Sequence, residues 1–145
     1  MKIGGRYSHL NGYEWLQHHH TDIWPEIVDV ISSVDITMHR TKISKEKTKL
    51  DKEVYNPTTL NAGLSKEFSK RKWEKKVRTN YWLADDYELM QRTMKLPVDD
   101  QYKEIIRAGK EPISSFNEID FVKNRIAVEV QFGKYSFIAY DLFVK

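Results

Sequence analysis

Apolar residues change their spacing near residue 115, so the chain must combine two kinds of secondary structure. Upstream they recur at intervals of three and four, a period that predicts amphipathic helices. Downstream, between Ile126 and Phe132, they alternate with polar or small residues, which predicts a strand with one apolar face. The order is therefore mostly helices first, followed by a hairpin of strands. At 145 residues, we expect a single domain spanning 1–145. The first helical stripe is Trp24, Ile27, Val28 and Ile31.

Capping signals predict three further helices. Asn56-Pro57 reads as an N-cap followed by the first helical position. Asp85 and Glu88 have the spacing of a capping box. A stripe that begins near Pro97 ends at Gly109. The apolar residues expected on these helices are Leu60, Leu64, Phe68, Leu89, Met90, Val98, Tyr102, Ile105 and Ile106.

A hairpin at about 116–133 brings polar groups together. We predict a strand from Phe116 to Val122, joined to the alternating strand by the two-residue turn Lys123-Asn124. Asp120 would then lie diagonal to Glu129, on the face opposite the apolar residues. Gln131 follows Glu129 at strand spacing and would share that face.

Two carboxylates and an amide form a hard oxygen ligand set. Carboxylates that lie close together repel each other, and a divalent cation relieves that repulsion. Mg²⁺ takes one or two protein carboxylates together with water and phosphate. Asp120, Glu129 and Gln131 are therefore candidate catalytic residues, with Asp120 and Glu129 as candidate Mg²⁺ ligands. On spacing alone, however, the solvated face of a half-buried strand is the simpler explanation.

Positive charge is concentrated in two segments. Residues 40–49 hold five basic groups and one acidic group, and residues 65–78 hold seven and two, although the net charge of the chain is only +3. A basic surface on an otherwise acidic protein is typical of phosphate binding, whereas solvated helix faces are the alternative. The candidate DNA-binding residues in the first segment are Arg40, Lys42, Lys45, Lys47 and Lys49.

Other classes of site have little support in the sequence. The chain has no cysteine, which fits a cytoplasmic protein. It has no apolar run long enough for a membrane span and no nucleotide-binding loop, so we expect neither a membrane partner nor a nucleotide cofactor. His18-His19-His20 is a weak metal motif, because consecutive helical side chains diverge by about 100°.

Several separated blocks resemble the type II restriction endonucleases of the BglII/BstYI family. The run from Glu118 to Phe132 resembles their active-site hairpin, in which an Asp, a loop and Glu-x-Gln follow one another. The similarity is closer to the BstYI side of the family and covers nearly the whole chain. The other matching blocks are residues 7–12, 40–49, 78–81 and 131–145.

The resemblance implies the α/β class, with a restriction-endonuclease-like mixed sheet flanked by helices, of the PD-(D/E)xK type. It implies a homodimer that binds double-stranded DNA and cuts a GATC-centred palindrome, such as purine-GATC-pyrimidine, with Mg²⁺ held by Asp120 and Glu129. It also places Lys134 toward the DNA, and a helix at Tyr135 onward. A further active-site residue would come from a helix near Trp73-Glu74-Lys75-Lys76.

Relatives of this family continue past the position of Lys145, so we expect a C-terminally truncated chain that lacks some strands. Two alternatives to a site-specific endonuclease follow. One is an inactive DNA-binding or dimerisation fragment of such an enzyme. The other is a DNA-repair nuclease with the same core.

Overall fold

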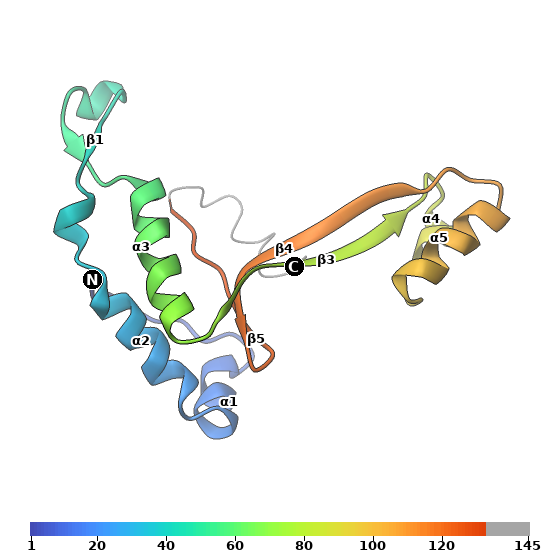
Figure 1. Ribbon diagram of the computed structural model, residues 1–145, viewed down its shortest axis with the longest axis horizontal. Coiled ribbons are helices and arrows are strands. Elements are labelled where there is room, and N and C mark those ends of the chain that lie inside the picture. The colour runs from blue at the N-terminus through green and yellow to red at the C-terminus, as the bar shows by residue number, and fades with distance from the viewer. Residues whose placement is uncertain (133–145) are drawn as a thin grey trace. The chain divides into compact units, whose positions relative to one another are not determined.

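The chain divides into two compact units, Met1–Lys75 and Lys76–Lys145. A computed structural model describes residues 1–132 (Figure 1). Helices are combined with two small sheets, which confirms the α/β class. The expectation of one domain over 1–145 stays a prediction, and so does the assignment to the PD-(D/E)xK type.

The first unit is mostly helical. Helices α2 and α3 contact each other, α1 packs on α2, and the two-stranded sheet β1-β2 is antiparallel. Trp24 of α2 meets the ring of Tyr13 on α1 edge-on, with the ring centroids 5.1 Å apart. Its elements are α1 (Gly12–His19), α2 (Ile23–Ser33), η1 (Ile36–His39), β1 (Lys42–Ile43), η2 (Lys47–Lys49), β2 (Glu53–Val54) and α3 (Pro57–Lys70).

Helix α3 has the cap and the buried face that its sequence predicts. The Asn56 side chain accepts a hydrogen bond from Thr58 N at 3.0 Å, and Leu60, Leu64 and Phe68 are all buried. The face of α2 differs from the prediction, because Ile23 and Val30 are fully buried whereas Val28 is exposed. The predicted stripe is correct in part, because Trp24, Ile27 and Ile31 are half-buried, and the fully buried residues lie one position before Trp24 and Ile31.

The second unit contains the three-stranded sheet β3-β4-β5, apart from Glu74 and Lys75 at the start of β3. Between β3 and β4 the chain forms the helical pair α4–α5 (Figure 1). The short helix α4 is capped by Asp86, which accepts from Leu89 N at 2.9 Å, so the predicted cap at Asp85 is wrong by one residue. The small core here consists of Ala84, Leu89 and Ile105. The elements are β3 (Glu74–Leu83), α4 (Tyr87–Thr93), α5 (Val98–Arg107), β4 (Ile113–Lys123) and β5 (Ile126–Val128).

The predicted hairpin is present, but its turn is displaced. Strands β4 and β5 pair in the register Lys123↔Ile126, Val122↔Ala127 and Phe121↔Val128. The turn is therefore Asn124-Arg125, not Lys123-Asn124. Both turn residues have positive φ, 51° and 66°, as a type I′ turn requires.

Candidate active site

Asp120 lies near the end of β4 and fixes the chain that leaves β5. Its Oδ2 accepts a hydrogen bond from Val130 N at 2.9 Å, in a half-buried position. Within residues 1–132, Val130 N is the group that donates to this carboxylate, and the bond uses Oδ2, not Oδ1. The side chain of Asp120 thus joins the two strands where their main-chain pairing stops.

Glu129 follows β5 directly, and the register places it beside Asp120. Directly opposed residues share a face, so extending the observed pairs by one residue puts Glu129 opposite Asp120. Glu129 is half-buried and Gln131 is exposed. The predicted strand through Phe132 is too long, because β5 ends at Val128. Beyond the end of this ladder, Val130 N bonds to the Asp120 side chain.

This donor set fits Mg²⁺ in number and kind. Asp120 and Glu129 would supply one or two carboxylate oxygens, and water or phosphate completes such a shell. Among residues 1–132, no group of three or more His, Cys, Asp or Glu side chains is placed to hold a metal ion. The predicted site has two carboxylates, Asp120 and Glu129, so water or phosphate would have to supply the remaining Mg²⁺ ligands.

Two residues beside this site were missed from the sequence, although alternation could have indicated one of them. Glu118 precedes Asp120 by two residues on β4 and therefore shares its face. Arg78, on β3, forms an ion pair with Glu118 in which Nε and Oε2 lie 2.6 Å apart. Arg78 belongs to the basic segment 65–78 and to the matching block 78–81, but its place beside Glu118 depends on the pairing of β3 with β4.

The candidate phosphate-binding residues belong to the first unit. They lie within or beside β1 and η2, and all five are exposed. Arg40 is partly used in the fold, since its Nε donates to Glu53 O at 3.2 Å. Ser44, which is 5% exposed, organises the loop: its N donates to Lys52 O at 2.9 Å, and its Oγ accepts from Glu46 N at 3.2 Å. The lysines are thus displayed on an internally bonded hairpin.

The remaining predictions near the site have different outcomes. Lys134 and the helix expected from Tyr135 lie outside the described residues. The stretch Trp73-Glu74-Lys75-Lys76 is not helical from Glu74 onward, because β3 begins there. Helix α3 already ends at Lys70, and Trp73 is buried in edge-on contact with Phe68, at a centroid separation of 5.2 Å. The predicted helical origin of an extra active-site residue in this stretch is therefore wrong.

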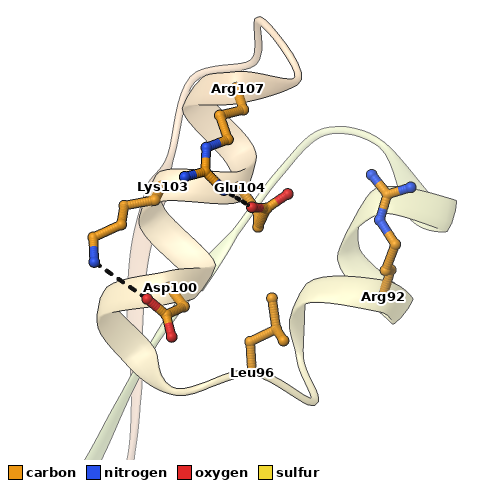
Figure 2. A pocket seen from close by; sticks show the side chains of 6 residues that line it. All are labelled: Arg92, Leu96, Asp100, Lys103, Glu104 and Arg107. Atoms are coloured by element: carbon orange, nitrogen blue, oxygen red, sulfur yellow. Dashed lines mark hydrogen bonds and ion pairs between the residues drawn. The ribbon is translucent and has the colours of Figure 1, made fainter.

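A hollow of about 490 Å³ at α4–α5 contains none of the predicted site residues (Figure 2). Two ion pairs within α5 line it: Lys103 with Asp100, at 3.2 Å, and Arg107 with Glu104. The two charges of each pair cancel, and Arg92 adds one positive charge to the lining. The hollow therefore offers no concentrated charge for a phosphate.

No helix among residues 1–132 is long and apolar enough to cross a membrane.

Comparison with known proteins supports the nuclease interpretation. No curated protein matches the chain significantly. The sequence model of the family described as "Restriction endonuclease BglII/BglIII" matches residues 5–145. The chain therefore belongs to the BglII/BglIII restriction endonuclease family, which indicates a type II restriction endonuclease acting on DNA.

Proposed function

We propose that this protein cleaves duplex DNA at a GATC-centred palindrome, purine-GATC-pyrimidine, by Mg²⁺-assisted phosphodiester hydrolysis in the cytoplasm. The observation that carries the proposal is the bond from Val130 N to Asp120 Oδ2. It holds the residue after β5 against the side chain of Asp120, so that Glu129 lies beside a second carboxylate within a chain that belongs to a nuclease family.

Each polar residue has a distinct role in this proposal. Asp120 and Glu129 would hold Mg²⁺, which when bound lowers the pKa of water and offsets charge that develops on phosphate. Gln131 orients water or a phosphate oxygen by hydrogen bonding. A side-chain amide does not titrate near neutral pH, so Gln131 is not a general base.

The palindromic target follows from symmetry. A homodimer with a two-fold axis presents the same hairpin to both strands of a palindrome. The exposed lysines at 42, 45, 47 and 49, together with Arg40, would bind phosphates and hold the duplex in register. Lys134 would contribute a contact to a guanine edge in the major groove.

The test is cleavage by the purified chain, followed by sequencing of the new DNA ends. Duplexes carrying GATC-centred sites are incubated with and without Mg²⁺. We expect defined ends at one palindrome, lost with Glu129→Ala and retained with Glu111→Ala, which removes an exposed carboxylate upstream of β4. Wild-type cleavage by Glu129→Ala refutes the proposal.

The outcomes also separate the alternatives. A folded chain that binds duplex DNA but never cuts it is a binding fragment. Ends that map to lesions or distorted structures instead of a palindrome identify a repair nuclease.

A further inference from the structure

Arg78 is held on the face of the sheet that carries Asp120. Its Nε donates to Glu118 Oε2 at 2.6 Å, and its guanidinium carbon lies 4.3 Å from the centroid of the Phe116 ring. Residues 116, 118 and 120 alternate along β4, so their side chains share one face. Because Arg78 contacts two of these three, it lies over that face.

The distance from this ion pair to the candidate active site is short. Two residues along a strand span about 6.6 Å, so Glu118 is one side-chain position away from Asp120. Together with Glu129, this face carries three carboxylates. Carboxylates repel a DNA phosphate, and Arg78 forms an ion pair with one of these three, Glu118.

Arg78 has unused hydrogen-bonding capacity. A guanidinium presents five N–H donors in a planar fork, and in the described part of the chain Arg78 donates only through Nε. Its side chain is 56% exposed. By contrast, Arg71 donates through Nε, Nη1 and Nη2 to Asp29, Glu67 and Ser33. Arg71 is therefore fully used in joining α2 to α3, whereas the Nη groups of Arg78 remain available.

We propose that Arg78 binds a DNA phosphate at the catalytic face, with Glu118 as the residue that positions it. The inference rests on the proposed function, because it takes Asp120 and Glu129 as the active site. Glu118 and the Phe116 ring fix the plane of the guanidinium, which leaves its two terminal nitrogens for a phosphate. Arginine suits this role since it can bind phosphate with two parallel hydrogen bonds.

The experiment measures duplex binding without cleavage, with Ca²⁺ in place of Mg²⁺, over a range of salt concentrations. Each lost phosphate contact lowers the slope of log affinity against log salt by about 0.9. We expect Arg78→Met to lower the slope by about this amount and the affinity by about tenfold or more. Arg107→Met removes one positive charge from α5, where it pairs with Glu104, and should change neither value.

Two milder variants separate binding from folding. Arg78→Lys keeps the charge but not the fork, so we expect the wild-type slope with a weaker affinity. Glu118→Gln keeps the shape of its side chain but loses both the positioning of Arg78 and one negative charge that repels phosphate. These two effects oppose each other, so we expect a smaller change in the affinity for the GATC duplex than Arg78→Met causes. Circular dichroism verifies that each variant is folded, and if Arg78→Met does not fold, the affinity of Arg78→Lys decides.

Several results overturn the inference. An unchanged slope in folded Arg78→Met does so, as does wild-type affinity in Arg78→Lys, or a wild-type chain that binds no duplex. Binding that depends on Arg78 in a chain that never cuts supports the inference and refutes only the proposed function.

Discussion

Asp120 has two separable roles, and substitution can distinguish them. Its carboxylate accepts the Val130 N–H at 2.9 Å, which is a structural role, and it is the proposed Mg²⁺ ligand. Asp120→Asn keeps an oxygen that can accept the same hydrogen bond but removes the charge. Asp120→Ala removes both.

The structural cost follows from the type of hydrogen bond. A bond to a charged group contributes about 1.5–3 kcal/mol, and one between neutral groups about 0.5–1.5 kcal/mol. Water reaches this half-buried position, so we expect Asp120→Ala to lower the free energy of local opening by about 1–2 kcal/mol. That change corresponds to about a 5- to 30-fold rise in the opening equilibrium. For Asp120→Asn we expect about 1 kcal/mol or less.

Amide hydrogen exchange at Val130 measures this opening directly. We expect Val130 to exchange about 5- to 30-fold faster in Asp120→Ala than in the wild type, with a smaller change in Asp120→Asn. The amide of Leu60, bonded to Asn56 O at 3.0 Å in α3, serves as the internal control. Both variants should lose Mg²⁺-dependent cleavage. Equal Val130 exchange in wild type and Asp120→Ala would contradict the structural argument, and cleavage by Asp120→Asn would contradict the metal role.

Three further predictions concern the framework of the site. Arg125→Gly should raise thermal stability by up to about 1 kcal/mol, because glycine adopts the φ of 66° without the strain of a side chain; a lower melting temperature contradicts the observed turn. Phe68→Ala should cost about 3–5 kcal/mol in urea unfolding, since Phe68 is 1% exposed and packs on Trp73, and a cost below 1 kcal/mol would exclude this core. Hydrogen bonds from Lys70 and Arg71 lower the pKa of Glu67 below its ordinary 4.5, so this stabilisation is present above that pH and is lost as pH falls through the lower folded value. Glu67→Gln should therefore destabilise the protein at pH 7 but progressively less below about pH 4.5, and a pH-independent difference between the urea midpoints argues against this role.

Local signals in the sequence predicted the elements that depend on local chemistry. Asn56-Pro57 marked the start of α3 because capping involves only neighbouring residues. The strand β3 was missed, although it spans Glu74–Leu83. Its first residues are largely lysines that show no alternation, and its pairing partner β4 is about 40 residues distant in sequence. Tertiary pairing, which no local pattern encodes, determines such a strand.

The shift in the turn leaves Asp120 and Glu129 on one face of the hairpin, although the predicted register was wrong. The predicted pairing set Asp120 opposite Ala127, whereas the observed register, extended by one residue, sets it opposite Glu129. The two registers differ by two residues, and a change of two preserves which residues share a face, whereas a change of one reverses it. The face that carries Asp120 and Glu129 is therefore the same in both, but their relation changes from diagonal to direct. Direct neighbours have Cβ atoms about 4.5–5.5 Å apart, compared with about 7–8 Å for diagonal ones. The shorter separation increases the repulsion between the two carboxylates, and with it the stabilisation that a bound cation would supply.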